Sequence, residues 1–208
     1  MKKITPYQST QNALASLDNG GRFYNIATKA NDGHVTTPEL AKAAGVFSDK
    51  QSMMLFLEMS LHELEDNAKR SVLSTLSEDL RAMYVEYAPQ LLLPSQAKER
   101  GKLAASAIIT GVPKQVDSRT EFTGFIMVPI TTGNVTTFTM IPIIDQYDIY
   151  EIRDNATSKE FVIAHAKSKN KLPEQAIRAG GVFKELKADK DEKESSNIFL
   201  ETIYYSIV

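Results

Sequence analysis

The stretch 125-FIMVPITTGNVTTFTMIPI-143 carries the clearest strand signal in the second half of this 208-residue chain. Its first six residues recur as its last six, with Phe, Met, Pro and Ile at matching positions. Both copies are rich in residues that favour strands, and a Thr-Gly-Asn turn signal separates them. The stretch therefore predicts a hairpin of two similar strands, 122–130 and 135–144, closed at Thr132 and Gly133.

The turn position also predicts a register. It would place Phe125 opposite Met140 and Met127 opposite Phe138, and aromatic–Met pairs across strands stabilise a sheet. Because proline has no N–H to donate, we expect the proline of each copy at an open edge or a bulge. The repeat has two interpretations: a chance similarity of two apolar strands, or a duplicated strand edge that binds a partner.

Outward from this hairpin, residues 101–208 continue to read as short strands. One strand begins near Ile108, and others are expected at 147–154, 160–166, 182–186 and 198–208. The polar stretch 187–196 is expected to be a loop. About six or seven strands with short connections are typical of a small antiparallel barrel or a curled sheet.

Residues 1–100 carry helix signals instead. The capping box Thr36-x-x-Glu39 starts one helix, which Gly45 ends. A second capping box, Ser48-x-x-Gln51, opens a long helix whose wide apolar face favours neighbours on more than one side. We therefore expect an α+β fold: an N-terminal helical bundle over 1–100 and a C-terminal antiparallel β domain over 101–208.

Composition excludes several classes of protein. The chain has no cysteine, so disulfide scaffolds, thiolate catalysis and cysteine-ligated metals are ruled out. A net charge of −2 does not indicate a strongly basic nucleic-acid binder. No apolar run approaches the about 20 residues of a membrane helix, and no signal-peptide core follows the N-terminal Met-Lys-Lys. We expect a cytoplasmic protein that uses no cofactor.

One row of side chains on the long helix has metal-binding character. Glu58, His62 and Glu65 are spaced four and three residues apart, which places them on one face of a helix. Such a row can bind a transition metal, but helical metal sites take further ligands from other helices. His34 and His165 do not repeat the motif. The alternatives are a solvated face that forms salt bridges and a face that binds a partner.

The segment Thr28–Glu39 has part of the pattern of a calcium loop. Gly33 stands at position 6 and Glu39 at position 12, where the turn glycine and the bidentate carboxylate belong. Thr28 and Ala30 occupy positions 1 and 3, where carboxylate ligands are needed. We therefore expect an ordinary helix–turn–helix connection at this segment.

Aromatic residues and lysines occur together in the strand half. Tyr150 and Tyr204 lie on expected strands, and Lys167, Lys169 and Lys171 cluster after the strand 160–166. Single-strand-binding proteins stack bases on aromatic rings and follow the phosphate backbone with lysines. In this combination the strand half resembles an OB-fold, which implies single-stranded nucleic acid as a partner. The balanced charge argues against strong phosphate binding.

No catalytic or cofactor motif is evident in the sequence. His165 alternates with Phe161 and Ile163 along an expected strand, and nothing marks a nucleophile beside it. We therefore expect a non-enzymatic binding or regulatory module that acts through a protein partner or as a homo-oligomer. One alternative is an OB-like single-stranded nucleic-acid-binding protein. The other is an unrecognised hydrolase or metal enzyme, with His62 or His165 in a pocket beside a carboxylate.

Overall fold

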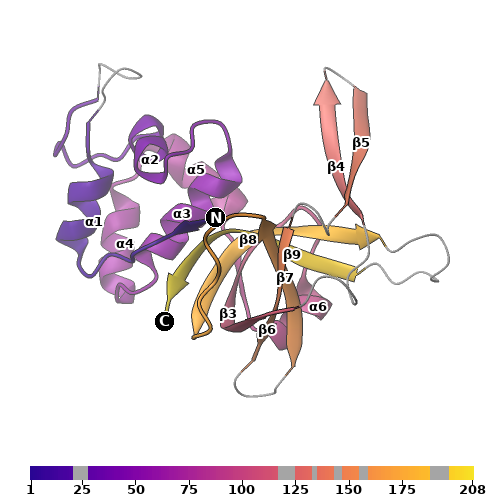
Figure 1. Cartoon of the computed structure of the whole chain (residues 1–208). Coiled ribbons are helices and arrows are strands. Elements are labelled where there is room, and N and C mark those ends of the chain that lie inside the picture. The colour runs from indigo at the N-terminus through magenta and orange to yellow at the C-terminus, as the bar shows by residue number, and fades with distance from the viewer. Residues whose placement is uncertain (21–27, 117–124, 133–134, 143–146, 155–158, 188–196) are drawn as a thin grey trace. The chain divides into compact units, whose positions relative to one another are not determined.

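The computed structural model describes residues 1–20, 28–116, 125–132, 135–142, 147–154, 159–187 and 197–208. For residues 125–132, 135–142, 186–187 and 197 the description covers the backbone alone. These residues form helices and one mixed sheet, which confirms the α+β class (Figure 1). They divide into a helical unit, Lys3–Pro89, and a sheet unit, which joins Met1–Lys2 to Gln90–Val208.

The change from helical to sheet unit falls at Pro89 and Gln90, earlier than the expected boundary at residue 100. Strand β2 (Gln90–Leu92) pairs in parallel with β3 (Ser106–Gln115). Helix α6 (Pro94–Arg100) packs against β3 and β7. These two elements therefore belong to the sheet unit, although their sequences have helix and break signals like those before them.

Within its described residues, the helical unit contains five helices. They are α1 (Thr10–Leu17), α2 (Thr37–Ala44), α3 (Lys50–Leu61), α4 (Asp66–Ser74) and α5 (Glu78–Tyr87). The capping box at Thr36 and Glu39 is formed as expected, and Gly45 ends α2 in the left-handed conformation at φ 74°. The segment before α2 meets the connection between α4 and α5 where the Val35 backbone pairs with Leu76.

Helix α3 is the most buried helix of this unit. Every residue from Ser52 to Leu61 is buried, and α3 packs against both α2 and α5. Its cap is Asp49, whose side chain accepts the Ser52 N–H, and not the expected Ser48. The helix stops at Leu61, and a separate helix, α4, starts at Asp66. The expectation of one long helix through this region is therefore wrong.

The sheet unit holds the remaining strands. They are β1 (Lys2–Lys3), β4 (Phe125–Thr132), β5 (Val135–Pro142), β6 (Tyr147–Arg153), β7 (Glu160–Ala166), β8 (Ile177–Lys187) and β9 (Asn197–Ile207). Their order in the sheet is β1-β9-β7-β6-β3-β8-β4-β5, and β8 pairs with β9 as well. The sheet is mixed, which corrects the antiparallel expectation: β2 is parallel to β3, and β7 is parallel to β9.

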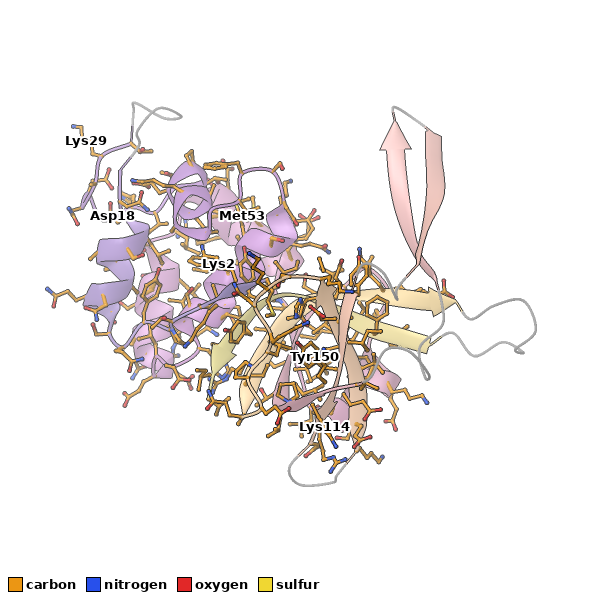
Figure 2. The ribbon with its side chains drawn as sticks, in the orientation of Figure 1. Lys2, Asp18, Lys29, Met53, Lys114 and Tyr150 are labelled. Atoms are coloured by element: carbon orange, nitrogen blue, oxygen red, sulfur yellow. The ribbon has the colours of Figure 1, made fainter. Side chains whose placement is uncertain are left out.

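Five of these strands pair in a closed cycle. Following the pairings leads from β3 to β6, β7, β9, β8 and back to β3. Each of the five therefore has a hydrogen-bonded neighbour on both sides. Their shared hydrophobic core includes Ile109, Tyr150, Ile163, Phe183 and Leu200. In Figure 2, Tyr150 lies among these strands.

A glycine allows β8 and β9 to approach closely. The pairing shifts register between Gly180 and Gly181, which makes an irregularity of the β-bulge type. A Cβ added at Gly181 would lie 2.0 Å from the Glu201 carbonyl oxygen. The expected strand began only after this Gly-Gly pair, whereas β8 starts at Ile177 and runs through it. The expected loop at 187–196 lies outside the described residues, apart from Lys187 in β8.

The hairpin of β4 and β5 exists, but its register differs from the expected one. Phe125 pairs with Pro142 and Met127 with Met140, so the pairing is shifted by two residues. The last registered pair is Thr132 with Val135, so Thr132 belongs to the ladder and not to the expected turn. Gly133 lies outside the described residues.

Candidate functional site

A buried polar cluster lies where β6 and β7 pair, at one end of the shared core. Asp148 of β6 is directly opposite His165 of β7, and both side chains are buried. The Asp148 carboxylate accepts a hydrogen bond from the Lys171 ammonium and another, at 3.3 Å, from the Ser168 N–H. The Tyr150 hydroxyl accepts the Leu172 N–H at 3.2 Å. The cluster therefore fastens the connection after β7 onto the sheet.

His165 is buried in surroundings that favour the uncharged form of its imidazole ring. Its ring stacks on Tyr150 with centroids 5.6 Å apart, and its Nδ1 lies 2.8 Å from the Ala166 carbonyl oxygen. Burial lowers the pKa of His165, and the Ala166 carbonyl and the Asp148 carboxylate offset part of that effect. Its Nε2 has no hydrogen-bond partner among the described residues.

The charge on Asp148 is stabilised in spite of burial. Burial alone would raise the pKa of this carboxyl, but the hydrogen bonds from Lys171 and Ser168 bring the pKa below its ordinary value. His165 and Asp148 thus satisfy the sequence condition of a histidine beside a carboxylate. The His165 side chain has no exposed surface, however, so it offers no proton-transfer surface to a substrate.

The residues expected to bind nucleic acid are only partly available at the surface. Tyr150 and Tyr204 are each 2% exposed, so their rings do not offer the open face that base stacking requires. Lys171 bonds to Asp148. Lys167 and Lys169 are exposed. The structure therefore brings the three lysines into one connection but leaves the two tyrosines in the core.

A shallow groove lies on the sheet surface away from this cluster. Its lining residues are Val112, Lys114, Glu151, Arg153 and Glu160, around a volume of about 140 Å³. Arg153 forms an ion pair with Glu160, donating from its Nε at 2.8 Å. Two cations and two carboxylates line the groove. This balance does not favour a run of phosphates.

The expected metal row on the helical unit is not formed. Glu58 is buried and accepts hydrogen bonds from Lys69 Nζ at 2.5 Å and from the Tyr84 hydroxyl at 2.6 Å. His62 follows the end of α3, and Glu65 is the exposed cap of α4, so the three do not share one helical face. Within the described ranges no cluster of three or more metal-ligand side chains occurs.

Burial raises the pKa of Tyr84, and its hydrogen bond to the Glu58 carboxylate raises it further. The Tyr84 hydroxyl is therefore held as a donor. Glu58 of α3 therefore links this helix to α4 through Lys69 and to α5 through Tyr84. The sequence predicted a metal ligand or a solvated face at Glu58 and did not predict this role.

The carboxylates in and beside the partial calcium pattern accept hydrogen bonds from backbone N–H groups. Both Glu39 oxygens accept hydrogen bonds, one from the Gly20 N–H at 2.7 Å and the other from the Thr36 N–H at 2.8 Å. Asp18 accepts the Gly33 N–H at 2.8 Å. These carboxylates close the connection between α1 and α2 through protein hydrogen bonds.

The outer edge of β5 has no registered neighbour among the described strands of the sheet unit. β4 pairs with β8 only at Phe125 and Ile126. Beyond Ile126, β4 and β5 pair only with each other among the described strands (Figure 1). β5 is the last strand in the sheet order. Strands of this kind present unpaired N–H and C=O groups that can accept another strand.

The two prolines establish which backbone groups face outward. Pairs alternate along an antiparallel ladder between those that exchange hydrogen bonds and those that do not. Pro129 pairs with Phe138, and Phe125 pairs with Pro142, so both prolines fall in the same alternate set. Since proline cannot donate, this is the set that does not exchange bonds. The register places both prolines in one alternate set, which agrees with the expectation that they face an open edge or a bulge.

It follows that the N–H groups of Thr136, Phe138 and Met140 point away from β4. We call this side of Val135–Pro142 the β5 edge. The opposite side of β4 is interrupted at its middle by Pro129, whereas the β5 edge has its proline only at the end. The sequence is also uncharged from Phe122 to Ile144, a signal that sequence reasoning left unused.

No known family model matches the chain, and no curated protein matches it at a significant level. Among the described residues, no helix combines the length and apolar character that crossing a membrane requires.

Proposed function

We propose that this chain is a non-enzymatic binding module that takes up a protein partner by strand addition at the β5 edge. One observation carries the proposal: a strand with three outward N–H donors, no charged residue and no neighbour on its outer side among the described strands. Main-chain bonds supply affinity in this mode of recognition, and alternate side chains supply specificity.

The closed cycle of five strands supports a particular scaffold for this module. Such a cycle is expected of an OB-like barrel, in which the connection between the first two strands commonly binds the ligand. Here that connection runs from β3 to β6 and contains the β4–β5 hairpin. The hairpin therefore occupies the position at which proteins of this architecture engage their partners.

Nucleic acid is the second candidate ligand, and the cyclic strand order is what favours it. The side chains favour it less. Tyr150 and Tyr204 are buried, Lys171 is engaged by Asp148, and the surface groove carries balanced charge. A protein strand needs none of these groups, because it binds the backbone.

The test compares two proline variants that differ only in the edge they affect. Thr131 and Thr136 form one registered pair of the hairpin, in the alternate set that exchanges no bonds. Thr136→Pro removes an outward donor from the β5 edge, and Thr131→Pro removes one from the outer side of β4. Each is used as a tagged full-length chain to capture partners from an extract of cells that make the protein.

We expect proteins captured by the unaltered chain and by Thr131→Pro to be lost with Thr136→Pro. An identical set of captured proteins for Thr136→Pro and the unaltered chain would overturn the proposal. Circular dichroism of both variants checks that the fold is retained.

A further inference from the structure

We infer that the partner at the β5 edge is the β5 edge of a second copy of this chain, paired antiparallel about Phe138. The inference rests on the proposed function, because it names the partner for the same edge. It would join two sheets into one across a twofold axis. Such an interface uses the same surface on both copies and must be complementary to itself.

The outward groups of β5 match in this arrangement. With Phe138 at the axis, it faces Phe138 of the second copy, and Thr136 faces Met140. These three residues carry the outward N–H groups, and each would both donate to and accept from its opposite residue. No outward donor between Val135 and Ile141 would then be left unpaired.

Pro142 selects this register over its neighbours. The part of β5 without proline is Val135–Ile141, and Phe138 is its midpoint. Moving the axis one residue toward Met140 would place Pro142 opposite Thr136, where it cannot donate. Moving it the other way would place Met140 opposite Asn134, which lies beyond the strand. The register about Phe138 is therefore the one in which Thr136, Phe138 and Met140 each find both a donor and an acceptor on the second copy.

Sequence symmetry and charge favour a second copy over a different protein. The residues on either side of Phe138 are both threonines, so the strand reads alike in both directions at its centre. No charged residue occurs on β5, so no like charges meet across the axis. A short strand of high β-propensity with low charge and no internal proline is typical of self-pairing segments.

The absence of natural cysteines makes the register testable by disulfide formation. Facing residues that exchange hydrogen bonds have Cα atoms about 5.5 Å apart, which lies within the range that a disulfide spans. We expect full-length Phe138→Cys to form a linked dimer under mild oxidation. Thr136→Cys alone should link poorly, whereas a mixture of Thr136→Cys and Met140→Cys chains should link. Thr131→Cys on β4 is the matched control.

Sedimentation equilibrium of the full chain supplies the second measurement. We expect a reversible dimer for the unaltered chain and for Thr131→Pro. Thr136→Pro removes two donors from the symmetric interface, one in each copy, and should raise the dimer dissociation constant at least about tenfold. A dimer that is unaffected by Thr136→Pro would use another surface and would overturn the inference.

The outcomes separate this inference from the proposed function. A chain that stays monomeric to about 100 µM, or Phe138→Cys that links no faster than Thr131→Cys, overturns self-pairing. If partners are still lost with Thr136→Pro in the capture experiment, the β5 edge binds a different protein and the proposed function stands. If captured partners are also unaffected, both fail.

Discussion

Asp18, Glu39 and Asp148 are buried carboxylates, and each accepts hydrogen bonds from the backbone of a nearby connection. A carboxylate in a sequence is readily interpreted as a ligand or a catalytic group. Here burial would be costly without such bonds, and each carboxylate closes a loop by accepting them. Glu58 follows the same principle with side-chain donors from two helices.

His165 makes the stability of the sheet unit depend on pH. Since burial lowers its pKa below that of the unfolded chain, the unfolded state binds a proton more readily. The free energy of unfolding should therefore be highest above about pH 6.5 and fall as the pH drops below it. The groups that act on His165 are Asp148, Lys171, the N-terminal amine and the Ala166 carbonyl.

His165→Phe should reduce this decline between pH 7.5 and 5.5, while changing stability at pH 8 by no more than about 1 kcal/mol. Urea unfolding at several pH values measures both effects. The same decline in His165→Phe as in the unaltered chain would assign the pH dependence to other groups. The lowered pKa of Asp148 gives a separate loss at more acid pH, below about 3.9.

Glu58→Ala should destabilise the helical unit by about 2–3 kcal/mol, because it leaves the half-buried Tyr84 hydroxyl without its acceptor. Lys69→Met should cost less, since the Lys69 side chain is 24% exposed. Thermal unfolding followed by circular dichroism measures the difference. A smaller loss for Glu58→Ala than for Lys69→Met would show that the Tyr84 bond does not stabilise the unit.

Among single elements, the sequence predicted the features that depend on residues close together in the chain. The capping box at Thr36 and the stop at Gly45 fix α2, because the groups involved lie within one turn of each other. The hairpin was also predicted, but its register was not, because a two-residue difference keeps every side chain on the same face. The start of β8 was missed, because Gly180 and Gly181 read as a break.

Gly181→Ala tests the close approach of β8 and β9. The new Cβ would meet the Glu201 carbonyl oxygen at 2.0 Å, so the two strands must separate. We expect a loss of about 3 kcal/mol or failure to fold, although replacing glycine by alanine otherwise stabilises by about 0.4–1 kcal/mol. Chemical denaturation gives the value. A neutral or stabilising effect would mean that the bulge has room for a side chain.

At the scale of the whole chain, the cycle of pairings could not be predicted from periodicity. It depends on β9 pairing with both β8 and β7, and these contacts link residues that no local pattern relates. Tyr150 belongs to the core that these strands share, and Tyr204 of β9 is also buried. The sequence pointed to aromatic residues on strands but carried no signal for which face of each strand would be enclosed.

The burial of Tyr150 and Tyr204 leads to a prediction about nucleic acid, the second candidate ligand. The full chain should show no saturable binding of labelled single-stranded DNA or RNA up to about 50 µM at low salt. Fluorescence anisotropy measures this directly. Saturable binding that weakens steeply with added salt would instead make nucleic acid the ligand, and Lys167→Ala and Lys169→Ala would be the next variants.

Pairing of two β5 edges would protect the outward N–H groups of β5 from exchange with water. Amide hydrogen exchange of the full chain, measured residue by residue at low and high protein concentration, tests the claim that the two edges pair. We predict that Thr136, Phe138 and Met140 exchange at least about tenfold more slowly at high concentration. Met127 and Thr131, whose N–H groups face outward on β4, should not change. Equal exchange of the β5 amides at both concentrations would contradict the claim.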